Sequence, residues 1–232
     1  MALRDRLAAF DWRYSLRELA LIIVGILVAL WLNEWNAQRH HRIAELVLLR
    51  EIHSSLASDL SGLQETADAL RLSEQRTSAL RDHLLAERPY DGELDILFGS
   101  AYGFRLSRLN TAPYQALKGR GLDLVSDDAV RLAIVRVFET RAAELSRADE
   151  VIINVSFDVL RPYYLERFQN IEFLERATPQ NYAEVAVDPY FRNLLDYRLV
   201  VLRRAILPRY EQAIEDIIGL VDIIGRELVE SE

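Results

Sequence analysis

The sequence predicts an all-α protein in which a single N-terminal transmembrane helix continues into a long helix and an elongated antiparallel helical bundle. The first observation is an unbroken apolar run over residues 19–32. The second is the recurrence of apolar residues at spacings of three and four along the following chain, which is typical of helices. The expected divisions are a short N-terminal segment over 1–13, a transmembrane helix over 14–35 and a helical soluble domain over 36–232.

The apolar run is short for a membrane span, but its flanking residues extend it. The strictly apolar stretch has about 14 residues, whereas a spanning helix needs about 20. Residues 14–35 cover about 33 Å at the helical rise, which is enough to span. No small-x-small cleavage site follows the run, so we expect the segment to be retained. The expected anchor residues are Trp12, Tyr14, Glu18, Gly25, Ala29, Trp31 and Trp35.

Two features of the anchor leave alternatives open. Glu18 either marks an ion path or a partner, or lies at headgroup depth beside Arg17. Gly25 and Ala29 form a small-x-x-x-small pair, which allows a second helix to approach closely in lipid. Between Glu18 and Asn33 the sequence carries no further polar side chain, and this disfavours a pore.

The distribution of charge predicts the location and the partners. Four arginines precede the apolar run and three follow it within a comparable stretch. The positive-inside rule therefore favours a cytoplasmic N-terminus, with the large domain in the periplasm and the anchor in a bacterial inner membrane. A formal net charge of -8 and the lack of a basic patch argue against nucleic acid as a partner. The expected partners are the lipid bilayer and either a second copy of the chain or another envelope protein.

Helical sequence continues from the anchor to about Glu87, where residues 88–92 supply a stop signal. Apolar residues along this helix alternate at spacings of three and four, which indicates a narrow seam that pairs with another helix as in a coiled coil. The seam residues are Leu46, Leu49, His53, Leu56, Leu60, Leu63, Ala67 and Leu70.

The middle of the chain predicts a helical corner. We expect a second helical block over residues 92–107, followed by a short helix that Thr111 caps. Gly119 or Gly121 is expected to end this short helix in a left-handed conformation. Ser126 is expected to cap the next long helix.

Prolines mark several features of the second half of the chain. Pro162 is expected to kink or end the long helix that follows the corner. The segment at Thr178 and Pro179 is the best candidate for a mobile surface loop. A last helix over residues 189–228, bent at Pro208, carries an apolar stripe with the period of the first helix. We therefore expect it to return antiparallel along the first helix.

Two segments carry a resemblance to a known family. Residues 18–36 and the corner at 114–122 resemble, in that order, an uncharacterised family of bacterial single-pass membrane proteins classed as a domain of unknown function. In that family a Glu opens the apolar run, Trp-Asn closes it, and a Leu-x-x-x-Gly corner precedes a long helix. The resemblance implies an anchor with a helical soluble domain, and it implies no activity. Trp31 and Arg120 depart from the pattern, so no functional residue is carried over.

Candidate chemistry is sparse. His40 and His41 are adjacent on a helix and point in different directions, and no third ligand is spaced to join them, so we predict no metal site and no cofactor. His53 is either a hydrogen-bonded core histidine or a protonation switch. Acidic groups on the later helices are typical of solvated faces rather than of acid–base catalysis. These groups are Asp149 with Glu150, and Glu211 with Glu215 and Asp216.

The sequence thus predicts a membrane-anchored helical scaffold or sensor that acts through protein–protein interaction and has no catalytic activity. One alternative is a ligand- or lipid-binding sensor module, with a cavity between the middle helices near Tyr163, Tyr164 and Tyr182. Another alternative is an oligomeric channel formed by the anchor helix.

Overall fold

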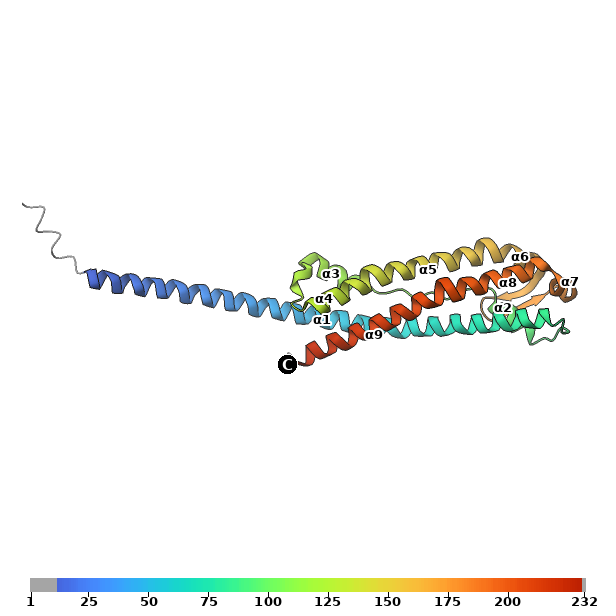
Figure 1. Ribbon diagram of the computed structural model, residues 1–232, viewed down its shortest axis with the longest axis horizontal. Coiled ribbons are helices and arrows are strands. Elements are labelled where there is room, and N and C mark those ends of the chain that lie inside the picture. The colour runs from blue at the N-terminus through green and yellow to red at the C-terminus, as the bar shows by residue number, and fades with distance from the viewer. Residues whose placement is uncertain (1–11, 231–232) are drawn as a thin grey trace, which may run out of the picture. The chain divides into compact units, whose positions relative to one another are not determined.

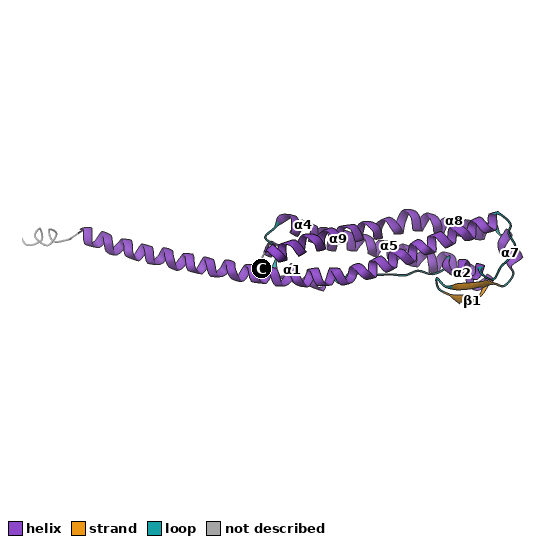
Figure 2. Cartoon of the chain, turned by 90° about the horizontal axis from the view of Figure 1, so that it is seen from below, coloured by secondary structure: helices purple, strands orange, loops and turns teal. Residues whose placement is uncertain are grey.

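The computed structural model describes the backbone of residues 12–230 and the side chains of residues 17–230. The chain divides into two compact units, Met1–Val47 and Leu48–Glu232. Helix α1 (Trp12–Leu85) begins in the first unit and ends in the second, within two residues of the predicted stop (Figure 1). The predicted all-α fold is confirmed, and one two-stranded hairpin is the exception in the described chain (Figure 2).

The second unit is built from the later part of α1 and two further helical rods. The middle rod consists of α4 (Asp128–Val135), η2 (Arg136–Arg141), α5 (Ala142–Asn154), η3 (Val155–Leu160) and α6 (Arg161–Arg167). The last rod consists of α8 (Pro189–Val201), η4 (Leu202–Ile206) and α9 (Leu207–Glu230). Helix α7 (Tyr182–Val187) precedes the last rod. Figure 1 shows α1, the middle rod and the last rod side by side.

Ion pairs fix the direction of the last rod against α1. The Nη2 atom of Arg71 lies 3.0 Å from Oε1 of Glu211, and Nη1 of Arg81 lies 3.3 Å from Oδ1 of Asp196. Residue numbers therefore rise along α1 as they fall along the last rod. The predicted antiparallel return of the last helix is confirmed within the second unit.

Neither Pro162 nor Pro208 interrupts its helix. The π-helical segment η3 ends two residues before Pro162, and η4 ends two residues before Pro208. In an α-helix, a proline has no N–H to donate to the carbonyl four residues earlier, and its ring clashes with that carbonyl. The wider π turn leaves room for the ring. The rod continues to Arg167, so the prediction that Pro162 ends its helix is wrong.

The predicted helical block over residues 92–107 is only half helical. Helix α2 (Leu94–Ser100) is followed by an extended segment, residues 103–110, before α3 (Ala112–Arg120) and the short η1 (Leu122–Leu124). The chain here returns from one end of the bundle to the other, and extended backbone covers about twice the distance per residue of a helix. The helical expectation for the end of this block is therefore wrong.

The corner after this segment begins and ends where the sequence indicated, with different capping groups. Thr111 lies at the start of α3 without a capping hydrogen bond, and Oδ1 of Asn110 accepts from the Ala112 N–H at 3.1 Å. Gly121 has φ 106°, the positive value expected for one of the two glycines. The prediction for Ser126 is wrong, because the carboxylate of Asp127 caps α4 by accepting from two backbone N–H groups.

The expected mobile loop at Thr178 and Pro179 is a strand. Strands β1 (Phe168–Glu172) and β2 (Arg176–Pro179) pair antiparallel, and Phe168 lies opposite Pro179. The hydroxyl of Thr178 donates to Oδ2 of Asp95 in α2 at 2.5 Å, and Pro179 is buried. Packing against α2 therefore orders a segment whose local sequence reads as a loop.

Candidate functional site

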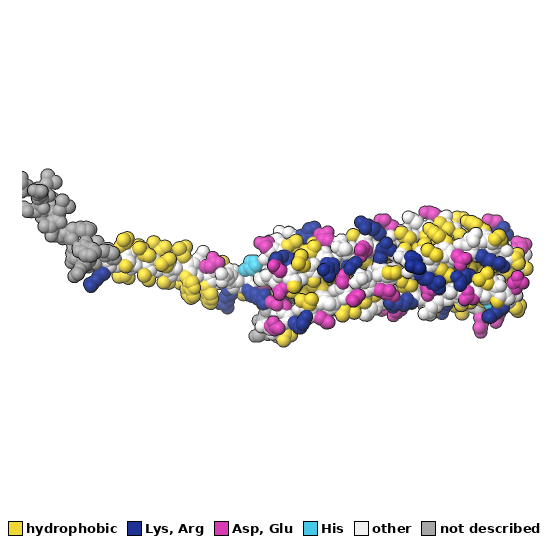
Figure 3. All heavy atoms as spheres, viewed as in Figure 1, with side chains coloured by type: hydrophobic (Ala, Val, Ile, Leu, Met, Phe, Trp, Pro, Cys, Tyr) yellow, Lys and Arg dark blue, Asp and Glu magenta, His cyan; other side chains and the backbone are white. Residues whose placement is uncertain are grey.

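Residues 19–32 of α1 form a continuous apolar surface in the first unit. Exposed fractions are large all around the helix, from 48% at Ile23 to 73% at Leu21. An 18-residue window of this helix has a mean hydropathy of 1.8, and no described part of the chain buries it. Figure 3 shows this apolar band on α1, and it shows a mixture of charged and apolar side chains on the surface of the second unit. One helix is thus long and apolar enough to span a membrane.

Aromatic side chains lie at the C-terminal end of this surface. Trp31 and Trp35 are both exposed, and the guanidinium carbon of Arg39 lies 5.9 Å from the ring centroid of Trp35. Indole rings with a nearby cation suit the boundary between hydrocarbon and headgroups. The side chains of Trp12 and Tyr14, expected at the other end, lie outside the described residues.

The polar and small residues of the anchor are also exposed. Glu18 is exposed at the N-terminal end, and at the other end the amide of Gln38 donates to Glu34 at 3.2 Å. A side chain added at Gly25 would meet no described atom within 4 Å, and Ala29 is exposed. The surface that carries Gly25 and Ala29 is therefore open to a second helix or to lipid.

The predicted seam of α1 is only partly the face of this helix that is buried. Fully buried residues of the predicted seam are Leu49, Leu56, Leu63, Ala67 and Leu70. Half-buried residues of the predicted seam are Leu46, His53 and Leu60. The core also takes residues that sequence reasoning missed, namely Ile52, Thr66, Ser73, Thr77, Leu80 and Leu84. The buried face is wider than an alternating seam, because two other rods pack on α1.

His53 lies at the edge of this buried face and opens onto a groove. The groove has a volume of about 370 Å³, and its lining includes His53, Val221, Asp222, Gly225 and Arg226. A side chain atom added at Gly225 would lie 3.6 Å from Nε2 of His53, so the imidazole packs closely on α9.

The adjacent histidines do not belong to a cluster of ligands. His40 and His41 are exposed on the first unit. Within residues 17–230, no three His, Asp or Glu side chains lie close enough together to hold a metal ion.

A buried carboxylate links the middle rod to the last rod. Oδ1 of Asp149 accepts a hydrogen bond from the hydroxyl of Tyr210 at 2.8 Å. Burial raises the pKa of Asp149, while the Tyr210 hydrogen bond and the charge of Arg108 lower it. The backbone N–H of Ser107 in the extended segment also bonds to the Tyr210 hydroxyl. Three elements therefore meet at this pair, and the prediction that Asp149 lies on a solvated face is wrong.

Of the other acidic groups, Glu211 and Asp216 form separate ion pairs. Glu150 is exposed, Glu211 pairs with Arg71, and Oδ2 of Asp216 lies 2.7 Å from Nε of Arg141. These carboxylates do not converge on a common point with Asp149. The ion pairs of Glu211 and Asp216 are contacts between rods.

Arg198 is the most unusual polar residue of the second unit. Its side chain is fully buried in α8, and its Nη2 donates to the carbonyl of Gly103 at 2.7 Å and to Oγ of Ser73 at 3.2 Å. Its Nε and Nη1 atoms have no hydrogen-bond partner in the described part of the chain. Burial lowers the pKa of Arg198 to about 10. An arginine within the apolar stripe of a helix was the sequence signal that could have revealed it.

The tyrosines expected around a cavity occupy two different places. Tyr163 and Tyr164 fill the interior, where the Tyr164 ring stacks on Phe168 with centroids 4.5 Å apart. Their hydroxyls are both satisfied, and that of Tyr164 donates to the carbonyl of Phe98 at 2.8 Å. Tyr182 instead packs on Tyr90, with the two ring centroids 5.3 Å apart.

The larger surface grooves lie along α1, away from these tyrosines. One of about 480 Å³ runs between α1 and α9, and its lining includes Gln64, Asp68, Arg71, Glu211 and Ile214. A second of about 530 Å³ lies beside the extended segment, and its lining includes Arg50, Ser54, Ser58, Asp59 and Asn110.

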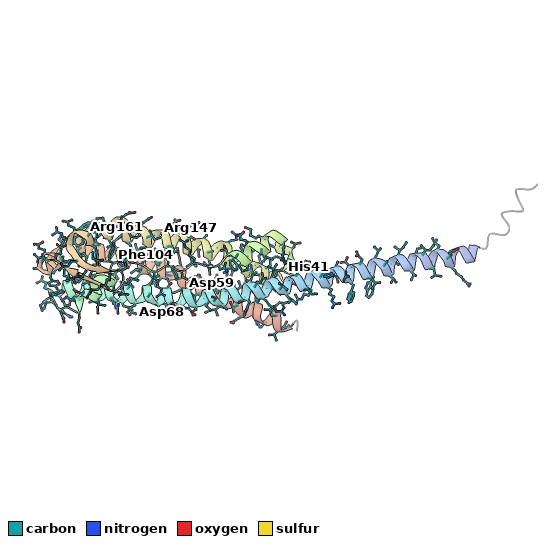
Figure 4. All side chains as sticks on the ribbon, turned by 180° about the vertical axis from the view of Figure 1, so that it is seen from behind. His41, Asp59, Asp68, Phe104, Arg147 and Arg161 are labelled. Carbon is teal, nitrogen blue, oxygen red and sulfur yellow. The ribbon has the colours of Figure 1, made fainter. Side chains whose placement is uncertain are left out.

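Aromatic and polar contacts hold the extended segment between α1 and the middle rod. Phe104 meets Phe157 edge-on at 5.4 Å, and Arg161 lies over the Phe157 ring. Figure 4 labels Phe104 and Arg161. At the other end, the Asn110 N–H donates to Oδ2 of Asp59 at 2.8 Å. Burial raises the pKa of Asp59, and this hydrogen bond lowers it. The segment is therefore a fixed part of the bundle.

Comparison of the chain with protein-family models, with curated proteins and with solved structures gave no match. The fold and the exposed segment define the class: an all-α protein with one helix that is long and apolar enough to span a membrane. The family resemblance of the anchor and the corner stays a prediction.

Proposed function

We propose that this protein is a membrane-anchored helical scaffold or sensor, which acts through protein–protein interaction and without catalytic activity. The observation that carries the proposal is the apolar surface of residues 19–32, which no described part of the chain covers. In water such a surface is costly, because about 25 cal/mol per Å² of apolar area is gained on transfer out of water. Insertion into a bilayer removes this cost.

A stripe of apolar side chains on α8 supports the interaction role. Tyr190, Tyr197 and Val200 are exposed, and their spacing places them on one side of this helix. Exposed aromatic residues are enriched where proteins bind one another. The partner is a second copy of the chain or another envelope protein.

The proposed location is the bacterial inner membrane, with the N-terminus in the cytoplasm and the large unit in the periplasm. The arginine excess before the apolar run supports this orientation. Fusion of alkaline phosphatase to the C-terminus tests it, since that enzyme is active only after export. An inactive phosphatase fusion together with a fluorescent cytoplasmic reporter fusion would reverse the orientation.

Membrane fractionation tests the anchor. The wild-type chain should stay with membranes after alkaline carbonate extraction. Leu21→Arg/Ile26→Arg should move it to the soluble fraction, because each arginine costs about 2.5–3.5 kcal/mol at the centre of an inserted helix. Leu132→Arg is the matched control, since Leu132 is exposed on α4 in the second unit. Release of the wild-type chain by carbonate would contradict the proposal.

Crosslinking in membranes, followed by affinity purification, tests the interaction role. Wild-type protein should yield a discrete crosslinked assembly, and Tyr197→Ser/Val200→Ser should reduce its yield. Glu150→Ser, at an exposed position of the middle rod, should leave the yield unchanged. A strictly monomeric protein without a crosslinked partner would contradict the interaction role and leave the anchor result standing.

A further inference from the structure

The strictly apolar part of α1 is shorter than the core of an ordinary bilayer. Residues 19–32 span about 21 Å at a helical rise of about 1.5 Å per residue. A typical hydrocarbon core is about 30 Å thick. Tilting the helix cannot remove the difference, because a tilted helix spans less of the bilayer normal than an upright one.

Exposed polar side chains lie at both ends of residues 19–32. Glu18 precedes it, and Asn33 and Glu34 follow it, and all three are exposed. No described part of the chain buries the apolar window between them. Arg17 carries a long side chain that can extend to the headgroups, whereas the side chains of Glu18 and Asn33 are too short to reach far. In a thick bilayer these groups would enter hydrocarbon.

We propose that the lipid partner of this anchor is a thin bilayer, and that α1 thins a thicker membrane around itself. The inference rests on the proposed membrane anchoring. The matching hydrocarbon core is nearer about 21 Å than about 30 Å, because that thickness leaves Glu18, Asn33 and Glu34 in the polar layer. Local thinning is one of the ways in which a bilayer adapts to a short apolar helix.

The tryptophans of the chain can report how deeply the ends of the anchor lie in the bilayer. Its 3 tryptophans, Trp12, Trp31 and Trp35, all lie at the ends of the anchor. In Trp12→Phe, fluorescence therefore reports on the end that follows the apolar run. Vesicles made from phosphatidylcholines with monounsaturated chains of about 14 to 22 carbons vary the thickness of the bilayer. Quenching by lipids brominated at different depths then gives the depth of these indoles in each bilayer.

A matched variant changes the apolar length without inserting residues. Glu18→Leu/Asn33→Leu/Glu34→Leu extends the apolar run to residues 18–35, or about 27 Å. Because all three side chains are exposed in the first unit, the variant leaves the packing of the second unit intact. Glu150→Leu/Glu175→Leu adds hydrophobic side chains at exposed positions of the second unit and serves as the control.

In the full-length Trp12→Phe background, the inserted fraction measured by flotation should be largest in the thinnest vesicles and fall several-fold in the thickest. The lengthened variant should shift this optimum to longer lipid chains, and the control should not. Equal insertion at all thicknesses, or an optimum that the lengthened variant leaves in place, would overturn the inference. So would crosslinked oligomers that form only in thick vesicles, because self-association would then relieve the mismatch. Failure to insert into any vesicle would instead refute the anchoring itself.

Discussion

Tyr210 of α9 donates a hydrogen bond to the buried carboxylate of Asp149 in α5, with 2.8 Å between the two oxygens. The pair lies where the last rod, the middle rod and the extended segment meet, since the Ser107 N–H also bonds to the Tyr210 hydroxyl. A buried polar pair of this kind stabilises one register of the rods, because sliding either rod would leave both groups without partners.

Substitution of Asp149 separates its charge from its hydrogen bond. Asp149→Ala should lower the free energy of unfolding by about 1–3 kcal/mol, because it leaves the buried Tyr210 hydroxyl without its acceptor. Asp149→Asn keeps an acceptor oxygen and removes the buried charge, so its stability at pH 7 should equal or exceed that of the wild-type protein. Urea unfolding of both variants measures this, and a loss in Asp149→Asn as large as in Asp149→Ala would contradict it.

The same pair sets a pH dependence. Burial raises the pKa of Asp149 above its ordinary value of 3.8. The unfolded chain therefore loses this proton first as the pH rises, so the stability that Asp149 contributes is present in acid and lost as the pH rises through the folded pKa. The stability advantage of Asp149→Asn should accordingly shrink as the pH is lowered towards about 4. An advantage that stays constant between neutral pH and about pH 4 would show that Asp149 does not titrate as described.

Arg198 should contribute packing rather than charge to stability. Replacement of buried charged groups by apolar residues of similar volume often stabilises the folded protein by about 1–4 kcal/mol. The same change leaves the Gly103 carbonyl without its donor, at a cost of about 1–3 kcal/mol. These two effects act in opposite directions and are similar in size, so Arg198→Met should lose less stability than Arg198→Ala. Arg198→Ala should lose more than about 2 kcal/mol, because it adds a cavity. Equal losses in the two variants, measured by urea unfolding, would count against this view.

Two glycines should respond to alanine in opposite directions. A Cβ atom at Gly99 of α2 would lie 2.1 Å from the backbone nitrogen of Arg176 in β2, so the hairpin would have to move. Gly99→Ala should therefore cost at least about 2 kcal/mol. Gly219→Ala, in the middle of α9 with no described atom within 4 Å of the new Cβ, should gain about 0.5–1 kcal/mol. Thermal unfolding of the two variants gives the comparison, and a loss of stability in Gly219→Ala would refute it.

The corner has its own pH signature. Oε1 of Glu139 in η2 accepts from Lys118 at 2.9 Å and from Tyr114 at 2.8 Å, and these contacts lower the pKa of Glu139. Its stabilising contribution is therefore present above the usual carboxyl pKa and lost as the pH falls through the folded pKa. Glu139→Gln should make stability less dependent on pH on the acid side. If the acid limb of the stability curve keeps its slope in this variant, the corner contacts do not contribute to it.

The predictions from sequence held where one local signal decides a structure. The period of the apolar residues predicted α1 and the last rod, and Gly121 took the positive φ that a corner between two helices requires. They failed where distant segments compete with local preference. Thr178 and Pro179 form a strand because α2 packs beneath them, and the end of the 92–107 block is extended because it must return along α1.

The candidate sites divide in the same way. The exposed apolar segment could be predicted, because an unbroken apolar run needs no tertiary information to be recognised. The buried partners of Arg198 and Asp149 could not be predicted, because the sequence around a charged residue does not show which distant group it meets. Local periodicity and length therefore suffice to predict the long helices, their order and the apolar segment. Which polar groups are buried and paired depends on which rods meet, and that follows from contacts between segments far apart in the chain.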